Sequence, residues 1–345
     1  MSYEDVRTGT SQVVLAKAVR LLLVGSLLVG GFYLAERIAR RLVGLPERNV
    51  VLREYSWRVF AIVPTMDDGY WHEMRIGMRE AAHRAHVGLE FIGPRYPNPD
   101  HIVDRFEQAI AAKADGIICY AEDLPAVASA IGRADRAGIP VVTIGLDLPE
   151  SGRRSYVGPD PFQMGYEVGR ALAMEPGIAE VAVVLEAAAF RPGSSQDRYL
   201  SGLRRAVGSA RGRVRLRRVV LAEAVAAEAE AEWEALFAGG RIDAICCASP
   251  ESTLRVAGFL AKRGLKGRVA LFGMGLLPET LWFMRQEMVT ATAASYPYAM
   301  GSDAVFLLAD ILAGRSHPTK IISGIQVFRQ EDVDGVLQRF WSRGD

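Results

Sequence analysis

Residues 113–149 read KADGIICYAEDLPAVASAIGRADRAGIPVVTIGLDLP. The segment contains two short, uncharged apolar runs, Gly116–Cys119 and Ile139–Ile144. Between them, apolar side chains recur at the spacing of one helix face, at Leu124, Val127, Ala128 and Ile131. Gly138 before the second run is typical of a helix end. Because strands that are buried on both faces read as unbroken apolar runs, the segment predicts a β-α-β unit of a parallel sheet.

The same alternation continues on both sides of this segment, from Ser56 onward. Further apolar runs occur at Val59–Val63, Val181–Leu185, Ala244–Cys247 and Val269–Phe272. Helical spacing of apolar residues recurs as well, for example at Met74, Met78, Ala81, Ala82 and Ala85. The pattern predicts an α/β protein, in which binding sites lie beyond the carboxyl ends of the strands.

The alternation is too long for one sheet, and three segments are predicted as crossovers between two lobes: Gly158–Pro161, Ser295–Pro297 and Thr319–Ile325. The expected fold is two doubly wound parallel-sheet lobes joined by a three-strand hinge, preceded by a hydrophobic N-terminal helix. Lobe one is expected to comprise residues 56–158 and 296–320, and lobe two residues 159–295 and 321–345.

The hydrophobic segment at the N-terminus is Leu21–Ala35, LLLVGSLLVGGFYLA, which has no charged residue. Residues 1–55 are predicted to be an uncleaved membrane anchor and linker, with a cleaved signal peptide as the alternative. A buried core helix fits less well, because the segment stands outside the β-α pattern. Basic residues flank it on both sides, so the positive-inside rule mildly opposes an external C-terminal domain.

Composition excludes two classes of protein. The 345 residues include 41 Lys and Arg against 40 Asp and Glu, a net charge of +1, so general nucleic-acid binding is not expected. The most basic run, Arg211–Arg218, alternates with apolar residues and is interpreted as an edge strand. With three cysteines, of which Cys246 and Cys247 are adjacent in an apolar run, the chain is no disulfide scaffold and carries no CxxC zinc pattern.

Sequence motifs of catalysis are absent as well. The chain contains no GxxxxGK[ST], HExxH or GxSxG motif, and no GxGxxG follows the first predicted strand. His83 and His86 are three residues apart on a predicted helix, without a third metal ligand at matching spacing. We therefore expect no enzyme, no metal and no cofactor.

Several stretches together resemble one family. Residues 59–82, VFAIVPTMDDGYWHEMRIGMREAA, resemble the opening of the periplasmic ribose- and galactose-type sugar-binding proteins, which share their fold with the effector domains of lactose-type repressors. Residues 113–149 are the most family-like stretch, and residues 155–173, SYVGPDPFQMGYEVGRALA, look like the crossover into the second lobe. The resemblance extends from Ser56 to the C-terminus and implies a protein that closes two lobes around a small ligand.

The first candidate binding group is a cluster of acids and aromatic rings after the first strand. Tyr70 and Trp71 follow Asp67 and Asp68 at a predicted strand end and helix start. Aromatic rings stack on the apolar faces of a sugar, and carboxylates bind its hydroxyls. The alternative is that Trp71 packs beneath the helix and Asp68 caps it.

The resemblance places the other ligand-binding positions at Asp147, Asp197, Arg198, Ser249, Gly275 and Ser295. Several of these depart from the family's pattern. Gly145 and Leu146 stand where the family has aspartate and arginine, Ser249 replaces an asparagine, and Gly275 replaces an aspartate. Losing charged partners weakens binding of a simple monosaccharide, so the ligand is expected to be sugar-like but larger, less hydroxylated or more cationic.

The expected function is that of an extracytoplasmic solute-binding protein for an ABC importer, anchored to the cytoplasmic membrane with its binding domain outside. The alternative is a membrane-tethered sensor that passes ligand occupancy to a signalling partner such as a histidine kinase. A lactose-type repressor is excluded, because the first 55 residues hold a hydrophobic segment in place of a DNA-binding helix-turn-helix.

Overall fold

The computed structural model describes residues 55–64, 69–94, 100–121, 125–187, 189–209, 214–222, 233–234, 237 and 240–342. The predicted membrane anchor lies outside these residues. Within the described ranges, no helix has the length and apolar character needed to cross a membrane.

Lobe one is built on a parallel sheet with the strand order β11-β5-β4-β3-β1-β2. The strands are β1 (Trp57–Ile62), β2 (Val87–Ile92), β3 (Gly116–Tyr120), β4 (Val141–Ile144), β5 (Ser155–Gly158) and β11 (Lys320–Ile322). One face packs against α2 (Gly69–Ala85) and α10 (Pro297–Leu312), and the other against α3 (Asp100–Ala111) and α4 (Pro125–Arg136). Both faces are therefore buried, as the unbroken apolar runs predict.

Lobe two has a second sheet with the order β12-β10-β9-β8-β6-β7. Its strands are β6 (Glu180–Glu186), β7 (Arg215–Ala222), β8 (Ala244–Cys247), β9 (Ala270–Met274), β10 (Ala291–Ser295) and β12 (Ile325–Arg329), and β12 is antiparallel to β10. The core on one face contains residues of α8 (Pro250–Lys262), α9 (Pro278–Arg285) and α11 (Val333–Ser342). The core on the other contains α5 (Pro161–Met174) and α6 (Ser195–Gly208).

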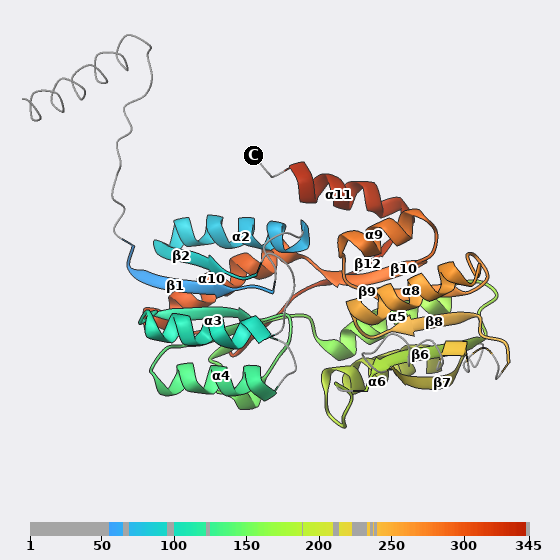
Figure 1. The fold of residues 1–345 in the computed structure, drawn as a ribbon, viewed down its shortest axis with the longest axis horizontal. Coiled ribbons are helices and arrows are strands. Elements are labelled where there is room, and N and C mark those ends of the chain that lie inside the picture. Colours follow the sequence, from blue (N-terminus) through green and yellow to red (C-terminus); the bar gives the residue numbers. More distant parts are fainter. Residues whose placement is uncertain are drawn as a thin grey trace, which may run out of the picture. The chain divides into compact units, whose positions relative to one another are not determined.

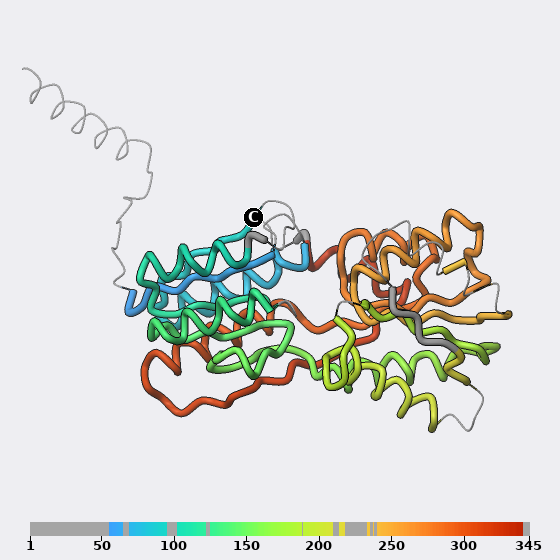
Figure 2. The backbone as a smooth tube through the Cα atoms, turned by 60° about the horizontal axis from the view of Figure 1, so that its bottom comes forward, coloured from blue at the N-terminus to red at the C-terminus, as the bar shows by residue number. Residues whose placement is uncertain are grey.

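The chain passes between the two sheets three times, after β5, after β10 and after β11. Figure 2 shows these passages in green, orange and red, and Figure 1 shows the helices on both faces of each sheet. The predicted fold class of two parallel α/β lobes is confirmed. The third passage follows Ile322, two residues beyond the predicted boundary, because β11 pairs with β5 as far as Gly158.

Helices α5 and α6 of lobe two pack with their backbones unusually close. A Cβ atom on Gly165 would lie 1.9 Å from the carbonyl oxygen of Tyr199, and one on Gly202 would lie 1.9 Å from that of Phe162. Only glycine fits at both positions. This close contact fixes the start of α6, which contributes to the site.

Candidate functional site

A cavity of about 580 Å³ is lined by residues of both lobes. Lobe one contributes the loop after β4, the end of β5 and β11, and lobe two contributes the start of α5 and the loop before α6. The charged residues that line it are Asp147, Glu150, Asp160, Arg191, Arg198 and Lys320. The cavity is thus bordered by both lobes and by two of the three crossovers, which is the position expected for a ligand site in this fold.

Asp147 lines this cavity, and both of its carboxylate oxygens already have cationic partners. Oδ1 lies 2.5 Å from Arg153 and Oδ2 lies 2.6 Å from Nζ of Lys320. The Arg153 side chain is only 6% exposed, so this ion pair is largely shielded from solvent. Asp147 therefore joins the loop after β4 to the hinge strand β11.

Arg198 lies on the opposite wall and pairs with a residue of the first crossover. Its guanidinium donates to Oδ2 of Asp160 at 2.6 Å, while Oδ1 of Asp160 caps α5 by accepting from the backbone N–H groups of Phe162 and Gln163. The neighbouring Asp197 instead accepts from the backbone N–H of Gly193 at 2.9 Å and shapes the loop. Of these two predicted positions, only Arg198 lines the cavity.

Tyr156 is a cavity residue that the sequence analysis missed. Its hydroxyl oxygen lies 3.0 Å from the carbonyl oxygen of Gly145 and 2.8 Å from that of Pro159, so its single O–H is shared between the end of β4 and the first crossover. Burial, and then the negative charges of Asp147 and Asp160, raise the pKa of this hydroxyl. The sequence signal for this role was a polar aromatic residue two positions before the predicted crossover Gly158–Pro161.

Ser249 lies in lobe two at the end of β8 and is buried. Its hydroxyl caps α8 and donates to Oε1 of Glu186, at the end of β6, at 2.5 Å. Arg255 lies 3.5 Å from the same carboxylate oxygen. The pKa of the nearby Glu251 carboxyl is raised, chiefly because protein atoms displace solvent around it and further because of the Glu186 charge. Ser249 thus lies in a polar group at the ends of two adjacent strands.

Gly275 follows β9 in a left-handed backbone conformation, with φ of +82°. A Cβ atom there would lie 3.0 Å from Cγ of Pro250. An aspartate at this position would therefore be strained.

Tyr70 and Trp71 form an aromatic cluster at the start of α2. Trp71 is 6% exposed and belongs to the lobe-one core, with its ring edge-to-face against Tyr70 at 5.3 Å and Tyr120 at 4.7 Å. Tyr70 is half-buried and contacts the cores of both lobes. This packing favours a structural role for Trp71. Asp67 and Asp68, predicted beside it, lie outside the described residues.

Ser295 ends β10 at the second crossover and is 4% exposed. It borders a second, smaller cavity and does not line the larger one. The structure therefore brings Asp147 and Arg198 to one cavity, and the other described candidates do not line it. Within the described ranges, no group of three acidic, histidine or cysteine side chains is arranged to hold a metal ion.

The sequence pattern of the periplasmic binding protein domain matches residues 59–316. The chain belongs to this family. Among solved structures, GanP, a glucose-galactose binding protein from Geobacillus stearothermophilus, is 29% identical with a TM-score of 0.69, over 80% of this chain and 98% of its own. XylFII in the XylFII–LytSN complex is 26% identical with a TM-score of 0.63, over 80% of this chain and 98% of that chain.

A curated relative is the periplasmic protein TorT of Escherichia coli strain K12, which is 26% identical over 164 residues. The alignment covers 46% of this chain and 46% of TorT, so the chain matches about half the length of this relative. The comparisons place the chain among binding proteins of the periplasmic type with sugar-binding structural neighbours.

Proposed function

We propose that this protein is an extracytoplasmic solute-binding protein whose two lobes close on a small, sugar-like ligand. The observation that carries the proposal is the cavity of about 580 Å³, which is lined by residues of both lobes and by two crossovers. A ligand that contacts both walls stabilises the closed form over the open one, so binding and closure are linked.

The ligand class follows from the groups in the cavity. Arg198 and Lys320 offer N–H donors beyond those used in their ion pairs with Asp160 and Asp147, and Glu150 offers carboxylate acceptors, which suits a molecule with several hydroxyl groups. GanP, which resembles this chain over most of its length, is a glucose-galactose binding protein.

Delivery of the ligand to an ABC importer is the role we favour for a sugar-binding protein of this kind. A sensor role is the second candidate, because XylFII, which is also similar to this chain, was solved in complex with LytSN. The two roles differ in outcome. Loss of an importer component abolishes uptake of the labelled ligand, whereas loss of a sensor leaves uptake intact and abolishes the transcriptional response to the ligand.

Both roles require the domain of residues 55–342 to lie outside the cytoplasm, and we propose the segment Leu21–Ala35 as the membrane anchor that holds it there. Protease added to intact cells or spheroplasts should remove the domain. Complete protection, with digestion after detergent lysis, would contradict an external location and both proposed roles.

The direct test of the binding function is a thermal-shift screen of aldoses, ketoses, polyols, amines and nucleosides, followed by calorimetric titration of the hits. We expect a sugar or polyol to bind and Arg198→Gln to weaken its binding about tenfold or more, since a charge-assisted hydrogen bond is lost. The matched control is Arg170→Gln, which removes an exposed pair with Glu167 on α5. Absence of binding by every sugar and polyol would contradict the proposed ligand class.

A further inference from the structure

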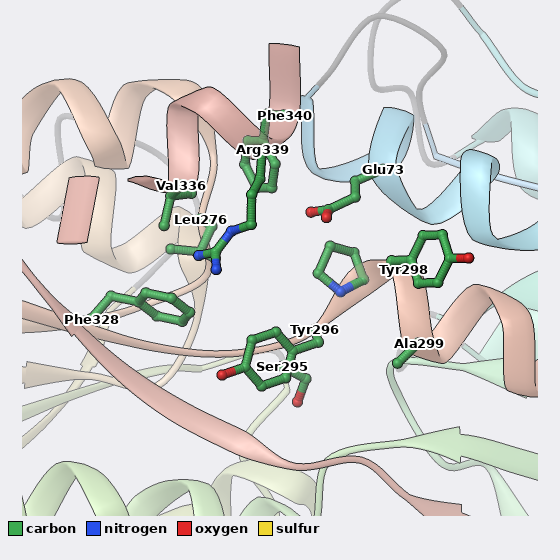
Figure 3. A pocket seen from close by; sticks show the side chains of 11 residues that line it. Glu73, Leu276, Ser295, Tyr296, Tyr298, Ala299, Phe328, Val336, Arg339 and Phe340 are labelled. Atoms are coloured by element: carbon green, nitrogen blue, oxygen red, sulfur yellow. The ribbon is translucent and has the colours of Figure 1, made fainter. Parts of the chain in front are cut away.

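The second cavity has a volume of about 260 Å³ and lies on the α2 and α9 side of the crossovers, beneath the C-terminal helix α11. Its walls come from α2, from the segment after β10, from β12 and from α11 (Figure 3). Helix α11 packs in the core of lobe two. Its Phe340 side chain also lies next to α2 of lobe one, because a Cβ atom added to Gly69 would be 3.0 Å from it. The cavity is therefore lined by elements of both lobes.

Most of the cavity wall is apolar. Leu276, Phe328, Val336 and Phe340 line it from lobe two, and all four side chains are buried. An engineered apolar cavity of about 150 Å³ binds benzene, so this cavity has room for a compact ligand with a branched or aromatic side chain. An apolar lining of this kind favours the hydrocarbon part of a ligand over a sugar ring.

Two opposite charges are set into this apolar wall. Glu73 of α2 is 7% exposed, and Arg339 belongs to α11. Figure 3 shows the Glu73 carboxylate and the Arg339 guanidinium turned into the same space from the two helices. Glu73 has interactions of its own, and a carboxylate has acceptor sites for about four hydrogen bonds. Arg339 forms no ion pair with any residue that the structure describes.

We propose that this cavity is a second ligand site, for an apolar α-amino acid. The ligand ammonium would donate to Glu73, its carboxylate would accept from Arg339 in the bidentate geometry that guanidinium groups favour, and its side chain would pack against Phe328 and Phe340. The proposal is independent of the sugar-like ligand in the larger cavity. It gives α11 a function: an amino acid held between α2 and α11 joins the two lobes next to the second crossover.

The test is calorimetric titration of the intact protein with L-leucine, isoamylamine and isocaproate. The last two are leucine without its carboxylate and leucine without its amine. We expect leucine to bind and each analogue to bind roughly tenfold or more weakly, because each lacks one charge-assisted contact. Failure of leucine to bind at millimolar concentration, or equal binding of either analogue, would overturn the proposal.

Substitutions locate the site. Arg339 is exposed at the surface. Arg339→Gln and Glu73→Gln should each weaken leucine binding. Arg315→Gln, which removes an exposed pair with Asp310, should leave leucine binding unchanged. Glu73 is buried, so substituting it can also destabilise the fold. The decisive tests are therefore Arg339→Gln and the comparison of leucine with isoamylamine and isocaproate. Unchanged leucine binding by Arg339→Gln would overturn the assignment, and so would binding that Arg198→Gln abolishes, since that would place leucine in the larger cavity.

Discussion

At the scale of single residues, a carboxylate beside a cavity can bind a ligand or stabilise the fold through ion pairs, and its partners show which of these roles it has. The family resemblance predicts Asp147 as a ligand contact. In the structure both oxygens bind cations, Arg153 from six residues along the chain and Lys320 from the hinge strand β11. Sequence reasoning found the position, but the partner 173 residues away is brought near only because β11 pairs with β5 in the sheet of lobe one.

Asp147→Asn is expected to lower the free energy of unfolding by about 3 kcal/mol or more, because it leaves the buried Arg153 guanidinium without its anion. Urea denaturation measures this. The matched control is Glu90→Gln, which breaks a pair with Arg58 whose two side chains are each 55% exposed and should cost less than about 1 kcal/mol. Equal effects of the two substitutions would show that the Asp147 cluster does not stabilise the hinge.

Trp71→Ala is expected to cost about 3–5 kcal/mol, the usual range for removal of a buried tryptophan. The control is Trp282→Ala on α9, where the side chain is 56% exposed and the change should stay within about 0.5 kcal/mol. Thermal denaturation distinguishes the two. A nearly unchanged melting temperature for Trp71→Ala, together with lost ligand binding, would restore the interpretation of Trp71 as a sugar-stacking surface.

At the scale of helices and strands, the apolar pattern predicts much of the architecture. Each of the six apolar runs forms a strand, and the arginine-rich run contributes to β7, which lies at the edge of its sheet. The pattern does not predict β10, whose sequence ATAAS consists of small and hydroxyl residues, because small residues give no strand signal even when all five are buried. The spacing of residues also does not predict the left-handed backbone conformation of Gly275, because that conformation depends on the packing of α8.

The close contact of α5 and α6 gives a prediction about a single methyl group. Gly165→Ala would place Cβ 1.9 Å from the carbonyl oxygen of Tyr199 and force the helices apart, at a cost of several kcal/mol. Gly258→Ala on α8 meets no atom within 4 Å and should be neutral or stabilising by up to about 1 kcal/mol. Chemical denaturation checks both variants. Similar stability of the two would contradict the described packing of α5 against α6.

At the scale of the whole domain, the three crossovers connect sequence to function. Their positions are readable from the sequence because proline and glycine interrupt the β-α pattern at residues 158–161 and 295–297. The candidate site was harder to predict. It combines residues near positions 147, 156, 198 and 320, and their proximity follows from the order of strands in two sheets and not from any local motif.

The central claim is that the two lobes close over a ligand about these crossovers. Small-angle X-ray scattering of the domain, with and without a saturating ligand from the thermal-shift screen, tests it most directly. The account predicts a smaller radius of gyration with ligand, and for Arg198→Gln the same decrease only at about tenfold or more higher ligand concentration. An unchanged radius of gyration at proven saturation would contradict closure.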